Sequence, residues 1–119
     1  MSTTAKSAEL KIASIQMVST PDLQENLSTA SRLISTAAAD GAQLAVLPEY
    51  FCLMGLKDTD KVHAREGFGN GPIQEQLSQI AQENKLYLVA GTIPLEAKDP
   101  NKVLNTTLVF DPTGKPICR

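Results

Sequence analysis

The sequence predicts an α/β fold whose first part is a parallel strand pair, and two observations carry that prediction. Short apolar segments with apolar side chains on both faces, as in strands inside a sheet, alternate with longer segments whose apolar residues recur at helical spacing. In addition, the order strand, helix, strand near the start of the chain is a β-α-β unit, which gives parallel pairing and a right-handed crossover.

The β-α-β unit comes first. We expect a strand over residues 10–18, covered on both faces as a central strand would be, and then a break at 19–22 that supplies cap residues. A helix is predicted over 23–40, and Asp40 and Gly41 end it. Its apolar positions are Leu23, Leu27, Ala30, Ile34, Ala37 and Ala38. A short buried strand over 42–47 follows and ends at Pro48.

The second half begins with an irregular stretch. Residues 49–71 lack periodicity apart from a short helix predicted at 59–66, and Pro72 then suits the first turn of a helix with the stripe Ile73, Leu77, Ile80 and Ala81. Strands are predicted over 86–93 and 103–110, and the connection between them is too short for a crossover helix, so they should be antiparallel neighbours. Asp111–Gly114 fits a type I turn, after which 115–119 starts another strand.

Composition excludes several classes of protein. The chain has 119 residues, enough for one domain, and its net charge of −2 gives no electrostatic footprint for nucleic acid. No apolar run approaches the ~20 residues that span a membrane, and residues 1–9 form a polar tail without the apolar core of a secretory signal. Two cysteines cannot form a disulfide framework, which indicates a reducing, cytoplasmic compartment. We expect no metal and no cofactor.

Glu49 is the first candidate for chemistry. It follows a predicted buried strand and Pro48, so its carboxylate should lie at the carboxyl end of the sheet, where ligands bind in open α/β folds. We expect it to be mostly buried among Val46, Leu47, Tyr50 and Phe51, surroundings that suit a general base. The structural alternative is an ordinary glutamate exposed at a strand end.

The other candidates have simple structural explanations. Cys52 and Cys118 lack a neighbouring base and fit small hydrophobic residues better than nucleophiles. His63 has no second ligand at metal-site spacing and fits a solvated helix face, as do the charges around it. The glycine-rich stretch 67–71 lacks the phosphate-loop pattern and fits a turn before a helix. Asn105, polar within an apolar strand, should have a hydrogen-bond partner or face a site.

Several segments taken in order resemble the N-terminal half of the nitrilase superfamily of carbon–nitrogen hydrolases. They are Lys11–Met17, Asn26-Leu27, Gly41–Phe51 with its Leu47-Pro48-Glu49, Gly71-Pro72, Ala90–Pro94 and Asn105–Gly114. Within the family, Asp60-Lys61-Val62, Gly69–Pro72 and Gly91–Leu95 are similar to the branch of deaminated glutathione amidase and omega-amidase.

This resemblance implies a fold and a reaction. The fold would be the N-terminal half of an α-β-β-α sandwich, with residues 10–119 a partial hydrolase domain whose C-terminal half is absent. The family uses a Glu, a Lys and a Cys: the Cys forms a thioester with the substrate's acyl group, the Glu is the general base, and the Lys helps to stabilise the oxyanion. Glu49 matches the family Glu. The substrate would be a small-molecule amide, and the complete protein is expected to be a homo-oligomer.

The sequence departs from the family pattern in its other two catalytic positions. Lys115 does not lie at the position of the family Lys, and neither Cys52 nor Cys118 lies at that of the nucleophile. The chain alone is therefore expected to be an inactive fragment. Two alternatives remain: a non-catalytic α/β binding or assembly module, and, within the superfamily, a nitrilase or carbamoyl hydrolase.

Overall fold

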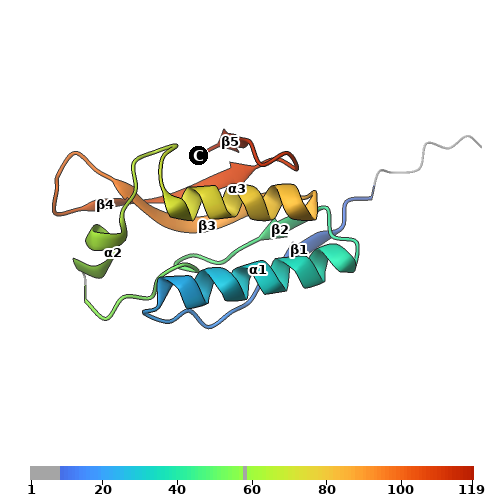
Figure 1. Ribbon diagram of the computed structural model, residues 1–119, viewed down its shortest axis with the longest axis horizontal. Coiled ribbons are helices and arrows are strands. Elements are labelled where there is room, and N and C mark those ends of the chain that lie inside the picture. Colours follow the sequence, from blue (N-terminus) through green and yellow to red (C-terminus); the bar gives the residue numbers. More distant parts are fainter. Residues whose placement is uncertain (1–8, 58) are drawn as a thin grey trace, which may run out of the picture.

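The computed structural model describes residues 9–57 and 59–119, which form two layers, a mixed sheet and the helices packed on it (Figure 1). The elements in chain order are β1 (Ile12–Ser14), α1 (Leu23–Ala39), β2 (Leu44–Val46), α2 (Thr59–Ala64), α3 (Pro72–Asn84), β3 (Tyr87–Glu96), β4 (Val103–Phe110) and β5 (Pro116–Cys118). The strands lie side by side in the order β1-β2-β3-β4-β5. Of the predicted tail, only Glu9 is described, and it is exposed.

The first two strands confirm the predicted parallel unit, and the third strand continues the parallel arrangement. β1 pairs in parallel with β2, and β2 pairs in parallel with β3, so that α1 and α3 belong to the two crossover connections. α1 begins with a side-chain cap, because the Asp22 carboxylate accepts a hydrogen bond from the Glu25 N–H at 3.1 Å. It ends at Ala39, one residue before the predicted end.

β1 differs from the strand predicted at 10–18. It is only three residues long and lies at one edge of the sheet, paired with β2 alone. Ile12 is 57% exposed and Val18 86% exposed, so the prediction of a central strand covered on both faces was wrong. Apolar composition shows that a segment favours burial, but the packing of other elements decides whether anything covers it.

The last three strands are antiparallel neighbours, as predicted for the two long ones. β4 has the predicted bounds, whereas β3 continues three residues beyond residue 93, because Pro94–Glu96 pair with Val103–Asn105 beyond an irregularity between Ala90 and Ile93. The turn at 111–114 is closed by a hydrogen bond from the Gly114 N–H to the Asp111 carbonyl at 2.9 Å. β5 then pairs with β4.

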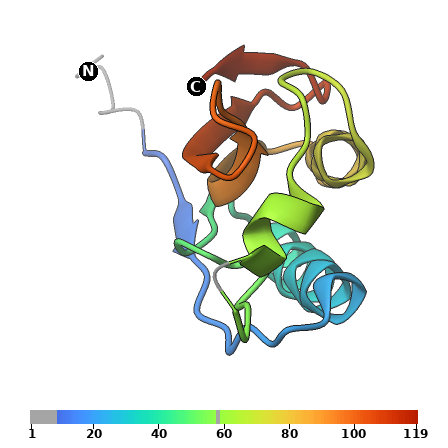
Figure 2. The ribbon, with the colours of Figure 1, turned by 90° about the vertical axis from the view of Figure 1, so that its left-hand side faces the viewer.

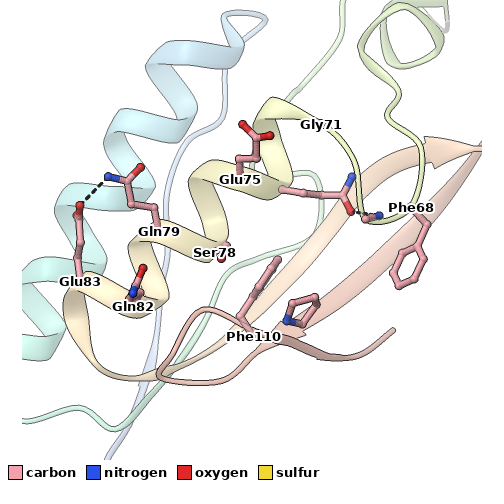
Figure 3. A pocket seen from close by; sticks show the side chains of 11 residues that line it. Phe68, Gly71, Glu75, Ser78, Gln79, Gln82, Glu83 and Phe110 are labelled. Atoms are coloured by element: carbon pink, nitrogen blue, oxygen red, sulfur yellow. Dashed lines mark hydrogen bonds between the residues drawn. The ribbon is translucent and has the colours of Figure 1, made fainter.

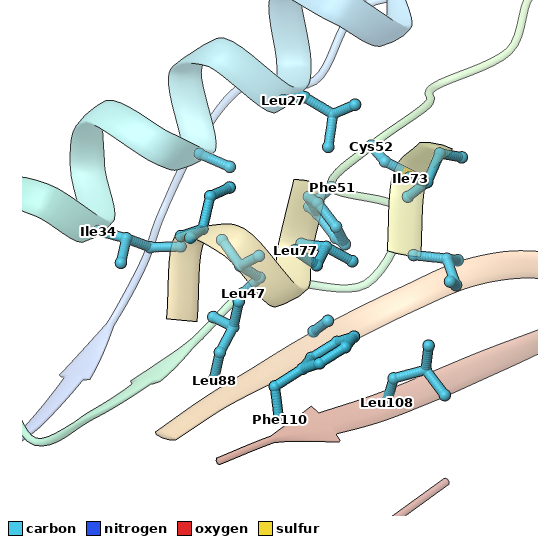
Figure 4. Close-up of a cluster of buried hydrophobic side chains, with 14 of the residues drawn as sticks. Leu27, Ile34, Leu47, Phe51, Cys52, Ile73, Leu77, Leu88, Leu108 and Phe110 are labelled. Carbon is cyan, nitrogen blue, oxygen red and sulfur yellow. The ribbon is translucent and has the colours of Figure 1, made fainter. Parts of the chain in front are cut away.

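The core lies between the sheet and the two long helices, which cover the same face (Figure 2). Strand residues alternate between faces, so Ala45, Leu88 and Phe110 contribute to the core while their neighbours point to the opposite side. Figure 4 shows Leu27 and Ile34 of α1 and Leu77 of α3 in the cluster of side chains between the helices and the strands. All three are buried, which confirms that the predicted apolar stripes of both helices face the core. No helix in the described part of the chain covers the opposite face of the sheet.

Candidate functional site

Glu49 lies where the sequence predicts, just beyond the carboxyl end of β2 in a tight turn. The Phe51 N–H donates to the Pro48 carbonyl at 3.2 Å, which closes the turn, and Tyr50 has a φ of 58°. Positive φ at the third residue is the property of type II turns that favours Gly or Asn at that position. An aromatic residue held in this conformation is uncommon, and such strain concentrates at functional sites.

The Glu49 side chain is exposed, which contradicts the prediction that it is mostly buried. The physical reason lies in its neighbours. Leu47 and Phe51 direct their side chains into the core, where they are 1% and 0% exposed, and so do not enclose the carboxylate. Apolar residues next to a carboxylate in the sequence surround it only if the backbone turns them to the same side, and this turn separates them.

β3 anchors the turn through two adjacent residues. Gly91 allows close approach of the chain: a Cβ at this position would lie 1.9 Å from the Leu47 carbonyl oxygen. Next to it, the Thr92 hydroxyl accepts a hydrogen bond from the Tyr50 N–H at 3.0 Å. The sequence pattern assigned no role to either residue. A glycine inside an apolar strand is nevertheless a sign of a bulge or close backbone approach, and that feature could have located them.

The Tyr50 side chain joins two more elements to the turn. The Lys61 ammonium of α2 lies 3.2 Å from the centroid of the Tyr50 ring, and the Asn105 side-chain amide of β4 donates to the Tyr50 hydroxyl at 3.3 Å. Asn105 therefore has the hydrogen-bond partner that its sequence context predicts. The prediction that the charges around His63 lie on a solvated helix face does not hold for Lys61, because its ammonium packs over the Tyr50 ring.

Cys52 is part of the core and not of a reactive centre. It is 1% exposed, its thiol donates weakly to the Thr92 carbonyl at 3.9 Å, and burial raises the pKa of this thiol from 9.0 to about 12. The nearby Glu66 carboxylate adds to this rise in the pKa. A thiol that keeps its proton at neutral pH is a poor nucleophile, which agrees with the interpretation as a small hydrophobic residue. Cys118 is exposed in β5.

The glycine-rich stretch forms a turn before α3, as predicted, and the N-terminus of that helix already has an anion. The Glu66 carboxylate, 7% exposed, accepts hydrogen bonds from the Ile73 N–H at 2.6 Å and the Gln74 N–H at 3.1 Å. These are the backbone donors that a phosphate would use at a helix N-terminus. No local pattern in the sequence indicates this internal cap, because Glu66 lies several residues before the helix it caps.

The described residues contain no group of three or more His, Cys, Asp or Glu side chains able to hold a metal ion. His63 is exposed on α2. Among the same residues, no helix is both long enough and apolar enough to cross a membrane.

Two of the hollows at the surface of the described chain bear on where the site lies. One, of about 350 Å³, is lined by Tyr50, Lys57 and Lys61 and so adjoins the Glu49 turn. The other, of about 530 Å³, lies between α3 and the β4–β5 hairpin, with Phe68, Phe110 and Pro116 among its lining residues (Figure 3). Glu49, Tyr50, Lys61 and Asn105 do not line the larger hollow, so it is separate from the candidate site.

Comparison with known proteins agrees with this geometry. The family model described as carbon-nitrogen hydrolase matches residues 11–119. The chain belongs to the carbon-nitrogen hydrolase family. The structure of Saccharomyces cerevisiae Nit3, a member of branch 10 of the nitrilase superfamily, is similar with a TM-score of 0.80 and 30% identity over 92% of this chain and 42% of that one. The α/β fold with its mixed sheet thus corresponds to part of a nitrilase-superfamily structure.

The curated relatives of this carbon-nitrogen hydrolase chain include amidases. It is 37% identical to omega-amidase NIT2 of Xenopus tropicalis over 90% of the chain, and 33% identical to deaminated glutathione amidase of a Synechocystis strain, also over 90%. The matches cover only 37% and 39% of those relatives. The chain therefore spans well under half the length of the curated relatives that it matches.

Proposed function

We propose that Glu49 is the general base of an amidase that acts on non-peptide amides of small carboxylic acids. The observation that carries the proposal is the position of Glu49: a carboxylate at the carboxyl end of a parallel strand, in a strained turn anchored on the neighbouring strand, within a chain of the carbon-nitrogen hydrolase family. The names of the relatives, omega-amidase and deaminated glutathione amidase, support this substrate class.

In the proposed reaction, Glu49 takes the proton of a cysteine thiol as the sulfur attacks the amide carbon. A tetrahedral oxyanion forms, and a lysine ammonium and a backbone N–H stabilise it. The C–N bond then breaks, the nitrogen leaves with the proton that Glu49 returns, and a thioester remains. Water activated by the same carboxylate hydrolyses the thioester to the free acid and regenerates the thiol.

None of the described residues lies at the family's position for the nucleophilic Cys or for the catalytic Lys that this scheme requires. Cys52 is buried with a raised pKa, and Lys61 lies on the ring of Tyr50. We therefore propose that the 119 residues alone do not hydrolyse amides. Loss of one oxyanion donor costs about 10²–10³ in rate, and loss of the nucleophile removes the covalent path.

The test compares the 119-residue chain with an extended form, a longer chain that also contains the family's catalytic Lys and Cys. Short omega-amides and deaminated glutathione are the substrates. We expect turnover only in the extended form. There, Glu49→Gln should keep the fold and remove most of the turnover, because an amide cannot accept the thiol proton. Glu83→Gln, an exposed carboxylate on α3, is the matched control and should leave the rate unchanged.

Three outcomes would contradict the proposal. Near-normal turnover in the extended Glu49→Gln variant would eliminate Glu49 as the base. Turnover by the short chain that Cys52→Ala abolishes would show that the nucleophile is Cys52. A complete absence of turnover in the extended form would favour a non-catalytic α/β binding module.

A further inference from the structure

The Glu49 carboxylate has no hydrogen bond of its own to any residue that the structure describes, and the side chain is exposed. Its position therefore depends on the backbone that carries it. That backbone is the turn over residues 48–51, and the conformation of the turn depends on Tyr50, whose φ of 58° is unfavourable for an aromatic residue.

Three elements hold Tyr50 in this conformation from different directions. Thr92 of β3 accepts from its N–H at 3.0 Å, Asn105 of β4 donates to its hydroxyl at 3.3 Å, and Lys61 of α2 places its ammonium 3.2 Å from the ring centroid. A cation over an aromatic face is attracted by the ring quadrupole, and the attraction grows as water is excluded. Since both Tyr50 and Lys61 are half-buried, this contact is shielded in part from solvent.

We propose that Tyr50 is a positioning residue for Glu49, held by Lys61 and Asn105, and that these contacts offset the strain of the turn. Through them α2 and β4, two elements outside the turn, control where the carboxylate of Glu49 lies. The inference rests on the proposed role of Glu49, because the orientation of this carboxylate matters to catalysis only if Glu49 is the base.

The first test needs no activity and uses the 119-residue chain labelled with ¹⁵N. Hydrogen exchange of the Tyr50 amide reports the bond to Thr92, the exchange of Leu88 in β3 reports global unfolding, and the order parameter of Glu49 reports its mobility. Lys61→Met should accelerate exchange of the Tyr50 amide about two- to fivefold relative to Leu88. Tyr50→Phe, which removes only the hydroxyl, should have an effect of similar size.

Three further variants separate positioning from general stability. Lys61→Arg keeps a cation over the ring and should restore the wild-type exchange rate, whereas Lys57→Met changes another lysine of the same hollow and should leave the rate unchanged. Tyr50→Gly tolerates positive φ but lacks the ring, so the order parameter of Glu49 should fall toward values typical of flexible backbone. Equal effects of Lys61→Met and Lys57→Met, or wild-type values in all variants, would overturn the proposal.

The second test uses the extended form with the same variants. Positioning predicts that Lys61→Met and Tyr50→Phe lower kcat with KM unchanged, and that Lys61→Arg recovers kcat. A change in exchange without a change in kcat would overturn the positioning role. Full activity of Glu49→Gln would instead overturn the proposed function, so the two failures are distinguishable.

Discussion

At the scale of single residues, Glu49 and Cys52 differ in exposure because the turn directs their side chains to opposite sides of the chain. Glu49 is exposed, whereas Cys52 is buried and bonded to the strand and helix around it: its carbonyl accepts from the Asn26 side-chain amide at 3.0 Å. Burial of an ionisable thiol favours its neutral form. The exposed Glu49 carboxylate can therefore reach a substrate, whereas the buried Cys52 thiol stays neutral within the core.

The raised pKa of Cys52 leads to a prediction about reactivity and pH. In the folded chain at pH 8, iodoacetamide should label Cys118, which is exposed, and not Cys52; intact mass should show one adduct, and two after unfolding in urea. Cys118→Ala should then give no native adduct. Rapid labelling of both cysteines in the folded chain would contradict the buried position of Cys52.

The same raised pKa determines the direction in which the stability of the folded chain changes with pH. The unfolded thiol loses its proton near its ordinary value of 9.0, whereas the folded thiol keeps its proton up to about pH 12. The folded state therefore binds more protons within this interval, and the contribution of Cys52 to stability is present below pH 9 and is lost as the pH rises toward 12. Urea denaturation at pH 8 and pH 10.5 should show a smaller loss of stability in Cys52→Ala than in the original chain.

At the scale of elements, α3 depends on a cap that comes from outside it. Gly71 at its start offers no side-chain bond, and the buried Glu66 carboxylate satisfies two of the first backbone donors instead. Glu66 also pairs with β3 alongside Leu95. Its N–H donates to the Pro94 carbonyl at 3.1 Å, and its carbonyl accepts from the Glu96 N–H at 2.9 Å. One residue thereby connects the loop, the helix and the strand.

Glu66→Ala should therefore lower the free energy of unfolding by about 1–3 kcal/mol, because it leaves buried N–H groups of Ile73 and Gln74 without their acceptor. Glu75→Ala, at an exposed acid in the first turn of the same helix, is the matched control and should cost less than about 1 kcal/mol. Urea denaturation measures both values. Equal costs for the two variants would show that only the helix dipole matters and the buried bonds do not.

The packing of α1 is tested separately. Leu27→Ala and Ile34→Ala should each cost about 2–4 kcal/mol, because each removes a side chain that is at most 2% exposed. Ser28→Ala, at an exposed position of the same helix, should change stability by less than about 0.5 kcal/mol. A cost below about 1 kcal/mol for either core variant would refute its assignment to the core.

At the scale of the whole molecule, the uncovered face of the sheet is apolar. The register places Ile12, Leu44 and Tyr87 in one row and Val46, Val89 and Val109 in the next, all on the side opposite the core. Ile12 and Tyr87 are 57% and 42% exposed. An apolar surface of this kind marks a binding surface or favours association.

We expect the 119-residue chain to self-associate through this face. Sedimentation velocity at increasing concentration should show species larger than a monomer, and Ile12→Lys combined with Tyr87→Lys should shift them toward the monomer. Ser28→Lys combined with Ser35→Lys adds the same charge at exposed positions of α1 and should have no such effect. A chain that remains monomeric at all concentrations would contradict this prediction.

Features that depend on neighbours along the chain could be predicted from the sequence. Local periodicity, caps and the lengths of connections predict the beginnings of α1 and α3, the bounds of β4, the parallel pairing of β1 with β2 and the antiparallel pairing of β3 with β4. They also predict the position of Glu49 at the end of a strand. The identity of the family likewise follows from ordered motifs, since nearly the whole chain matches it.

Features that depend on contacts between different elements are visible only in the folded chain. The exposure of Glu49, the strained turn at Tyr50, the clearance at Gly91 and the cap from Glu66 each require the coordinates of another element. Periodicity indicates which face of a segment is apolar, but it does not specify what packs against that face or which way a turn directs a side chain. Those outcomes are fixed by close packing and by hydrogen bonds between segments, which have no local pattern in the sequence.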